Sequence, residues 1–360
     1  MRESIRSRRG LADELRRNAA LYAVIAAFFG ATWLLASYQG ESFLPFLRGY
    51  VIRALRGLFL IASIFMLAVA LRAILRARTV PIMDTVRESL GYLRQSPFIT
   101  RFLFASAVLS IFMAAFLFNK MQIPHLRPFD WDQTFFDWDR MLFAGHDPWR
   151  ILHPLVGWPV VTIAIDFLYS LWVPLVFVFW AGLYASPAVD SSLRVRFWAS
   201  TVAAWILLGL VSATFLSSVG PCYFADIVPG DASPYRDLVA YLDGVNAGYP
   251  LASSSTKAYL WSIHTGLLDA PGGISAMPSM HNAQAVLFAA AAYGIRRWLG
   301  HIFAAYGVVI FVGSIHLGWH YAVDGIAGAA GAFAIWYVVS VVASRRLRRA
   351  GEMPVTAASA

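Results

Sequence analysis

Three side chains near the C-terminal end of the sequence have the types and spacing that acid–base or nucleophilic chemistry needs. His316, His320 and Asp324 lie four residues apart in GSIHLGWHYAVD, where a long apolar run begins. On a helix, residues four apart lie on one face, so Asp324 can accept a hydrogen bond from one ring nitrogen of His320. An imidazole held in one tautomer, with its second nitrogen free, is prepared to act as a base or a nucleophile. The alternative is a polar cluster that anchors the start of a helix in the headgroup layer.

Two basic residues upstream indicate an anionic substrate. Lys120 is followed, after six residues, by Arg127 and Pro128. The planar fork of arginine suits phosphate oxygens, and lysine adds a point charge. The alternative is that both side chains mark a membrane boundary by extending their charged ends into the headgroup layer.

A second histidine cluster precedes another apolar run. Residues 275–281 read SAMPSMH, and the proline at position 278 fits a helix start. Ser279 and His281 would then lie in the first turn, where unpaired backbone N–H groups and the positive end of the helix dipole favour an anion. Two histidines suffice for a double displacement at phosphorus, in which one attacks and the other protonates the leaving oxygen. The alternative for His281 is a packing role inside an apolar helix.

The composition indicates an integral membrane protein. Of the 360 residues, 59% are hydrophobic and 14% are charged, whereas a soluble domain is nearer half apolar and about a quarter charged. The single cysteine, Cys222, excludes an internal disulfide and a cysteine-built metal site. The net charge of +9 does not indicate nucleic-acid binding, because the basic residues cluster beside apolar runs. No cleavable signal peptide is expected, since no small-residue cleavage site follows the first apolar run.

The apolar runs predict an all-α polytopic membrane protein with about eight transmembrane helices. Each run is near the roughly 20 residues that a helix needs to cross a bilayer. We expect an N-terminal arm and two accessory helices over residues 1–101, a six-helix catalytic core over 102–343, and a basic cytoplasmic tail over 344–360. The predicted spans are residues 21–38, 57–75, 102–118, 159–184, 198–219, 278–295, 302–315 and 321–343.

Positively charged segments predict the orientation of these helices. Loops rich in Lys and Arg remain in the cytoplasm, and both termini are therefore expected there. The loops 39–56, 119–157 and 218–275, with the turn near His320, are expected on the extracytoplasmic side, together with every candidate catalytic residue. The segments that fix this orientation are the N-terminal arm and residues 72–101, 194–196, 296–297 and 345–349.

Together, the three clusters resemble the signature motifs of the type 2 phosphatidic acid phosphatase superfamily. The first family motif, which reads Lys, six residues, Arg-Pro, is matched by Lys120, Arg127 and Pro128. The second, Pro-Ser-Gly-His, is matched by residues 278–281, except that Met280 replaces the glycine. The resemblance covers roughly residues 102–343.

The third family motif reads Ser-Arg, five residues, His, three residues, Asp. His320 and Asp324 keep this spacing, whereas Gly313 and Ser314 stand in place of Ser-Arg. One phosphate-binding arginine is therefore missing, and we expect His316 or a residue from another loop to compensate. A non-glycine second motif, a third motif without arginine and two extra N-terminal spans are similar to the inositol phosphorylceramide synthase branch, the aureobasidin-resistance-type inositolphosphotransferases.

The resemblance implies a role for each matched residue. His320 would be the nucleophile that forms a phosphohistidine, Asp324 would orient it, and His281 would be the general acid and later the general base. No cofactor or metal is expected, because fixed cations stabilise the charge. The alternative is a zinc or iron site on the imidazoles and carboxylate of the third cluster. The residues expected to bind the phosphate are Lys120, Arg127, Ser279 and His316.

The resemblance further implies a lipid phosphotransferase that moves a phospho-headgroup from a phospholipid donor to a lipid alcohol. The alternative is a phosphatase that acts on a lipid phosphate or a polyprenyl diphosphate, with water as acceptor. A third possibility is a transporter or channel, but its charges would be spread along several helices and not gathered at one face. The sequence leaves the donor, the acceptor and the oligomeric state open.

Overall fold

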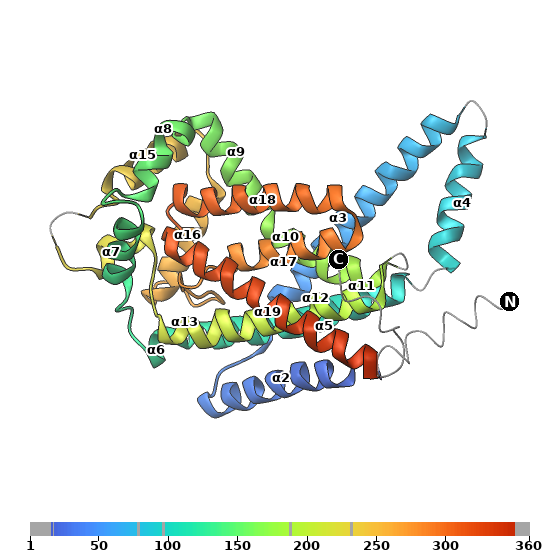
Figure 1. The fold of residues 1–360 in the computed structure, drawn as a ribbon, viewed down its shortest axis with the longest axis horizontal. Coiled ribbons are helices and arrows are strands. Elements are labelled where there is room, and N and C mark those ends of the chain that lie inside the picture. The colour runs from blue at the N-terminus through green and yellow to red at the C-terminus, as the bar shows by residue number, and fades with distance from the viewer. Residues whose placement is uncertain are drawn as a thin grey trace. The chain divides into compact units, whose positions relative to one another are not determined.

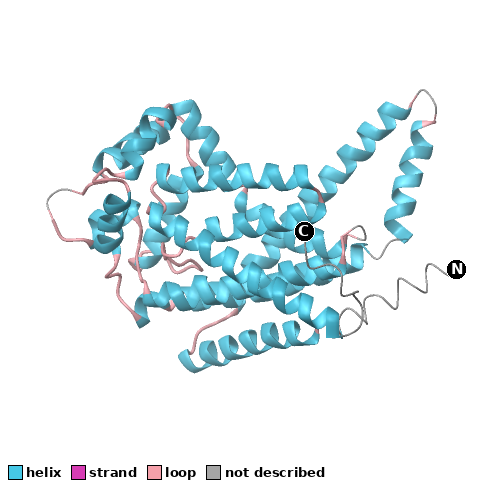
Figure 2. Cartoon of the chain, in the orientation of Figure 1, coloured by secondary structure: helices cyan, strands magenta, loops and turns pink. Residues whose placement is uncertain are grey.

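A computed structural model describes residues 16, 18–77, 80–95, 98–186, 189–230 and 233–349. Within these ranges the chain is helical and contains no strand, as Figure 2 shows. The predicted all-α fold is therefore confirmed. Most of the predicted N-terminal arm and the end of the predicted basic tail, residues 350–360, lie outside the described residues.

Six helical stretches in the described chain are long and apolar enough to cross a membrane, against about eight predicted. The two other predicted spans are helical but fall outside this set. α3 (Leu44–Arg76) has arginines on both sides of its apolar residues 57–71, and α17 (Met280–Ile295) has 16 residues, short of the roughly 20 that a bilayer needs. The six stretches are Ala19–Gln39 (α2), Phe98–Leu126 (α5 and α6), Pro159–Ala185 (α9 to α11), Ser191–Phe215 (α12 and α13), Arg297–His316 (α18) and Ala322–Arg345 in α19.

The chain divides into two compact units. The first comprises Met1–Ala115 with Val173–Val195, and the second comprises Phe116–Trp172 with Arg196–Ala360. In the first unit, α3 packs against α4 (Ile82–Gln95), and two arginines of α3 pair with one glutamate of α4. All residues of the three sequence motifs lie in the second unit, where the candidate site must therefore be sought.

Three helices form the centre of the second unit. α17 packs against both α18 and α19 (Ala322–Arg349), and Figure 1 shows the three together. The close approach depends on small residues, because a Cβ on Gly328 of α19 would lie 2.3 Å from the backbone oxygen of Ser279. Gly328 thus allows α19 to contact the start of α17 closely, as small residues do at helix–helix interfaces.

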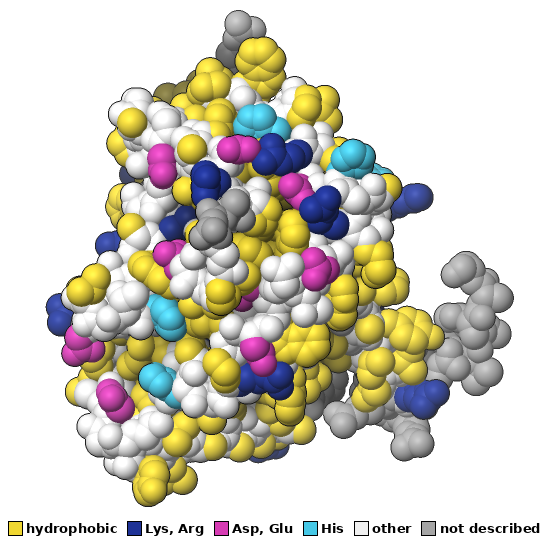
Figure 3. All heavy atoms as spheres, turned by 90° about the vertical axis from the view of Figure 1, so that its left-hand side faces the viewer, with side chains coloured by type: hydrophobic (Ala, Val, Ile, Leu, Met, Phe, Trp, Pro, Cys, Tyr) yellow, Lys and Arg dark blue, Asp and Glu magenta, His cyan; other side chains and the backbone are white. Residues whose placement is uncertain are grey.

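The long loops predicted between the spans are built from short helices. α7 (Asp132–Leu142) contacts α19, and α8 (Pro148–Val156) and α9 (Pro159–Ser170) contact α18. At this end of the second unit, acidic, basic and histidine side chains are interspersed with apolar ones (Figure 3). The remaining elements are α5 (Phe98–Met121), α6 (Ile123–Leu126), α10 (Trp172–Phe177), η1 (Val178–Gly182), α11 (Leu183–Ala185), α12 (Ser191–Ile206), η2 (Leu207–Ser212), α13 (Ala213–Phe215), η3 (Pro221–Tyr223), α14 (Phe224–Ile227), α15 (Arg236–Gly248) and α16 (Ala252–His264).

Candidate active site

His320 lies in a turn between two helices. α18 ends at His316, Gly318 adopts a left-handed backbone conformation with φ of 71°, and α19 begins at Ala322. Gly318 suits this turn because a residue without Cβ adopts positive φ at no steric cost. The helical spacing proposed for His320 and Asp324 therefore does not apply. The turn, and not one helix face, brings the two side chains together.

His320 and Asp324 are adjacent and buried. Nδ1 of His320 lies 3.4 Å from Oδ2 of Asp324, which is within ion-pair distance but outside hydrogen-bond geometry. The same carboxylate oxygen accepts the backbone N–H of Tyr321 at 3.0 Å. The side chain of Asp324 thus faces both the imidazole and the backbone of the turn that carries it.

The surroundings of His320 hold it in its neutral form. Burial, with a smaller contribution from the charge of Lys120, lowers the pKa of His320 to about 3, and a hydrogen bond to the backbone of Ala276 acts in the opposite direction. The backbone carbonyl of Ser314 accepts the N–H groups of Trp319 and His320 at 2.9 and 3.0 Å, which fixes the turn. A neutral imidazole is the form that can attack an electrophile.

His281 lies in the first turn of α17, beside His320. The centroids of the two imidazole rings are 5.7 Å apart. Ser279 is the N-cap of α17: its hydroxyl accepts the N–H of Asn282 at 3.4 Å, and its own N–H donates to the carbonyl of Asp324 at 3.0 Å. The predicted helix start is confirmed, and it connects the second motif directly to the third.

The two predicted phosphate-binding cations have different surroundings. Lys120 is half-buried in the last turn of α5, where a Cβ on Gly273 would lie 3.3 Å from its Cγ, and its charge acts on His320. Arg127 is 38% exposed, and its guanidinium pairs with the carboxylate of Asp130 at 3.1 and 3.4 Å. The structure therefore brings Lys120 to the histidines, whereas it pairs Arg127 with a carboxylate of its own loop.

A sequence-family model described as the PAP2 superfamily matches residues 133–338, which is more than half of the chain. The chain belongs to the PAP2 superfamily. No curated protein and no solved structure matches it significantly. The site histidines and Asp324 lie within the matched residues, whereas Lys120 and Arg127 precede them. Membership indicates a phosphatase- or phosphotransferase-type lipid enzyme, and the six apolar helices indicate an integral membrane protein.

In this PAP2 chain His316 belongs to a second cluster. Its Nε2 lies 2.9 Å from Oγ1 of Thr162, which in turn lies 2.8 Å from the hydroxyl of Tyr241. The ring centroid of His153 lies 6.1 Å from that of His316. Because α18 ends between His316 and His320, the structure does not bring the two imidazoles together. The expectation that His316 replaces the missing arginine gains no support from these contacts.

Ser314, which stands where other PAP2 motifs have arginine, makes structural contacts instead. It is fully buried, its hydroxyl donates to the carbonyl of Phe311 at 2.8 Å, and it accepts Nδ2 of Asn282 at 3.3 Å. Asn282 also donates to the hydroxyl of Ser279 at 3.0 Å. The position links α18 to the start of α17, and an arginine side chain would require the two helices to move apart.

Two carboxylates of α7, which the sequence analysis did not single out, hold the start of α19. Asp139 accepts the first two backbone N–H groups of α19 at 2.8 and 2.9 Å. Asp132 accepts the hydroxyl of Tyr321 at 2.8 Å and two backbone N–H groups of the loop after α13. Burial raises the pKa of Asp139 to about 7, although the two backbone donors act in the opposite direction. α7 thereby positions the turn that carries His320.

Asp166 of α9 has a comparable role at the start of α16. Its two carboxylate oxygens accept the N–H groups of Ala252 and Ser253 at 2.8 and 2.9 Å. The sequence contains signals for these residues. An acidic side chain within an apolar run is costly unless it is paired, and Asp132 and Asp139, seven residues apart, lie on one face of a helix.

Proposed function

We propose that the chain is a membrane lipid phosphotransferase that acts through a phosphohistidine on His320. The observation that carries this proposal is a row of three neighbouring side chains. The ring centroids of His281 and His320 are 5.7 Å apart, and Nδ1 of His320 lies 3.4 Å from Oδ2 of Asp324. A nucleophile with a charged group behind it, and a second proton carrier in front of it, are what a two-step transfer requires.

In the first step, a ring nitrogen of neutral His320 attacks the phosphorus of the donor, and the bond from phosphorus to the leaving oxygen breaks. His281, in its protonated form, gives its proton to that oxygen, so the donor leaves as an alcohol. Asp324 stabilises the positive charge that develops on the ring of His320. Lys120 stabilises the negative charge on the phosphoryl oxygens.

In the second step, the now neutral His281 removes the proton from the hydroxyl of the acceptor. The oxygen of the acceptor attacks phosphorus, and the bond from phosphorus to the nitrogen of His320 breaks. Both histidines return to their starting protonation states, so one donor and one acceptor are consumed in each cycle. The product carries the phospho-headgroup on the acceptor oxygen.

Transfer and hydrolysis differ only in the acceptor. Met280 in the second motif and Ser314 in the third support the branch that resembles inositol phosphorylceramide synthases. The burial of His320 and Asp324 also supports transfer, since a site that excludes water favours a lipid hydroxyl. Hydrolysis of a lipid phosphate or polyprenyl diphosphate is the second candidate, because phosphatases share the His–Asp spacing of the third motif.

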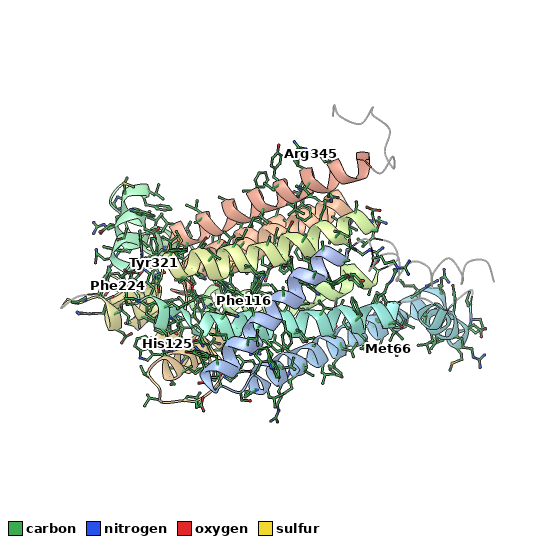
Figure 4. All side chains as sticks on the ribbon, turned by 90° about the horizontal axis from the view of Figure 1, so that it is seen from below. Met66, Phe116, His125, Phe224, Tyr321 and Arg345 are labelled. Atoms are coloured by element: carbon green, nitrogen blue, oxygen red, sulfur yellow. The ribbon has the colours of Figure 1, made fainter. Side chains whose placement is uncertain are left out.

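The proposed location of the reaction is the extracytoplasmic face. Tyr321, next to His320, and Arg345 lie at opposite ends of α19 (Figure 4). Arg296 and Arg297 lie at the junction of α17 and α18, at the end of α17 that is remote from the second motif. Because basic segments remain in the cytoplasm, these positions support a site on the other side of the membrane.

Product analysis tests the proposed function. Purified protein in vesicles would receive a phospholipid labelled in its phosphate, with and without a ceramide or diacylglycerol acceptor. We expect a new labelled phospholipid that requires the acceptor and is absent with His281→Ala. His301→Ala is the matched control, because His301 is exposed on the first turns of α18 and bonds Tyr293 at 2.8 Å. Water-soluble labelled phosphate as the sole product, with or without acceptor, would establish hydrolysis instead.

A further inference from the structure

The imidazole of His281 contacts two aromatic rings that no sequence motif includes. Tyr169 of α9 stacks on it with a centroid separation of 4.6 Å and an interplanar angle of 24°. Trp172, three residues further along the chain, contacts it with a centroid separation of 4.3 Å and an angle of 38°. Both aromatic side chains are buried, with 5% and 7% of their surface exposed. His281 therefore contacts two aromatic rings in addition to the imidazole of His320.

Trp172 is held by contacts of its own with α17 and α12. Nε1 of Trp172 donates to the backbone carbonyl of His281 at 3.2 Å, and its ring stacks on Trp205 at 5.8 Å. Trp205 in turn donates to Gln284 of α17 at 2.8 Å. A rigid column of aromatic rings thus reaches from α12 to the imidazole, and it fixes the plane in which that imidazole lies.

The ring nitrogens of His281 have no hydrogen-bond partner among the described side chains and backbone groups. His320, by contrast, has a carboxylate 3.4 Å away. Aromatic rings therefore contact the His281 ring, while its nitrogens are left to meet a substrate oxygen. A proton carrier needs this arrangement, because a nitrogen already bonded to protein cannot exchange a proton with substrate.

Stacked aromatic rings also stabilise a cation, because the face of the ring carries negative charge, and the effect increases where water is excluded. Burial opposes a charge on His281 most strongly, and His320 and Lys120 oppose it further from neighbouring elements. No carboxylate is paired with the ring to offset them in the described chain. The aromatic faces are then the groups in contact with His281 that favour its protonated form.

We infer that Tyr169 and Trp172 are positioning residues that clamp His281 and stabilise it as the imidazolium that donates a proton to the leaving oxygen. The inference rests on the proposed function for its catalytic consequence. The clamp itself is a property of the free protein. It can therefore be measured whether or not the chain transfers a phospho-headgroup.

Matched substitutions distinguish the effect of the aromatic ring from the effect of side-chain bulk. Tyr169→Phe and Trp172→Phe retain an aromatic face. Tyr169→Leu and Trp172→Leu replace it with an apolar side chain that has no π face. The titration of His281 would be followed by NMR of protein with labelled histidine in micelles, with His281→Ala to assign the signal. We expect each Leu variant to lower the pKa of His281 by about half to one unit, with little change in the Phe variants. An unchanged titration in both Leu variants would overturn the inference.

Turnover of two substrates distinguishes a proton-donor role from a packing role. One lipid phosphodiester carries a nitrophenyl leaving group, which departs without a proton, and the other carries a hexyl group, which needs one. For the Leu variants we expect the rate on the hexyl ester to fall roughly tenfold, and the pH above which this rate declines to move to a lower value. The rate on the nitrophenyl ester should stay within about twofold of the wild-type rate. Equal losses of rate on both esters, with a wild-type titration of His281, would show that Tyr169 and Trp172 only pack against His281. If wild-type protein turned over neither ester but the titration still responded to the Leu variants, the proposed function would fail and the clamp would stand.

Discussion

Two pairs of neighbouring histidines in the second unit have contrasting surroundings. The rings of His281 and His320 are 5.7 Å apart, and those of His153 and His316 are 6.1 Å apart. A carboxylate and a lysine lie beside the first pair. The hydroxyl groups of a threonine and a tyrosine lie beside the second. Both pairs bring two imidazoles together, and a lysine charge acts on each of them, Lys120 on His320 and Lys257 on His316. The carboxylate of Asp324 therefore distinguishes the first pair from the second.

The difference shows which feature of a histidine pair can support phosphoryl transfer. A hydroxyl group can orient an imidazole, but it offers little stabilisation to the positive charge that a nucleophilic nitrogen acquires. A carboxylate offers that stabilisation, and a nearby cation attracts the phosphate to the same place. We therefore propose that the first pair is catalytic and that the second pair packs α8, α9 and α18 together.

The largest expected effect is the loss of the nucleophile. His320→Ala should lower turnover by at least about 10³-fold, because the variant lacks the nucleophile of the proposed mechanism. Turnover of labelled phospholipid would be measured beside His301→Ala, which should behave as wild type. Membrane insertion and the melting temperature check that the variant is folded. Wild-type turnover in a folded His320→Ala protein would exclude the phosphohistidine.

A smaller effect is expected at the support of the first pair. Asp139→Asn retains one acceptor but weakens the bonds to the first N–H groups of α19, which should cost about 1 kcal/mol of stability. Since α19 carries Asp324, we expect turnover to fall about tenfold as its alignment with His320 loosens. The melting temperature and the turnover rate measure the two effects. Unchanged values for both would show that α7 does not position the turn.

The stability difference between wild type and Asp139→Asn should depend on pH. The pKa of Asp139 is raised in the folded protein to about 7, above its ordinary value of 3.8. A raised carboxyl pKa means that the folded state binds more protons, so this contribution to stability is full at low pH and is lost as pH rises through about 7. The melting temperature of wild type relative to Asp139→Asn should therefore fall between pH 4 and 7. A difference that grows with pH would contradict the assignment.

The helices and the helix start at the second motif could be predicted from the sequence, because apolar runs and helix caps act locally. Pro278 and the polar residues after it predict the start of α17, and the helix begins at Met280 with Ser279 as its cap. The resemblance carried by three motifs also predicts the family that the sequence match confirms. The number of spans is harder to predict, since α17 is apolar enough but too short to be counted.

Contacts between distant segments could not be predicted in the same way. Asp132 and Asp139 read as acids of an aromatic loop, yet each pairs with groups more than 80 residues away. The direction of His316 depends on where α18 ends and on the hydroxyl of Thr162, 154 residues away. Such pairings are set by how helices pack, for which a single sequence carries no periodic signal.

A still smaller effect is expected in the second histidine pair. His316→Ala removes the bond to Thr162 and leaves a small cavity, so we expect about 1–2 kcal/mol of lost stability and less than tenfold loss of turnover. The ratio kcat/KM and the melting temperature should be measured together with Thr162→Val, which removes the same bond from the other side. A loss of turnover comparable to that of His320→Ala would return His316 to the phosphate site, and the contrast between the two pairs would fail.

The smallest expected effect is that of a chelator. In the described part of the chain, no group of three or more His, Cys, Asp or Glu side chains is arranged to hold a metal ion, and Lys120 beside the first pair disfavours a second cation. Turnover after treatment with EDTA should therefore equal that of untreated protein. Loss of activity that zinc restores would contradict this. His316→Ala would then locate the metal: a variant that no longer responds to EDTA would assign the ion to the second pair, whereas a variant as sensitive as wild type would assign it to the first.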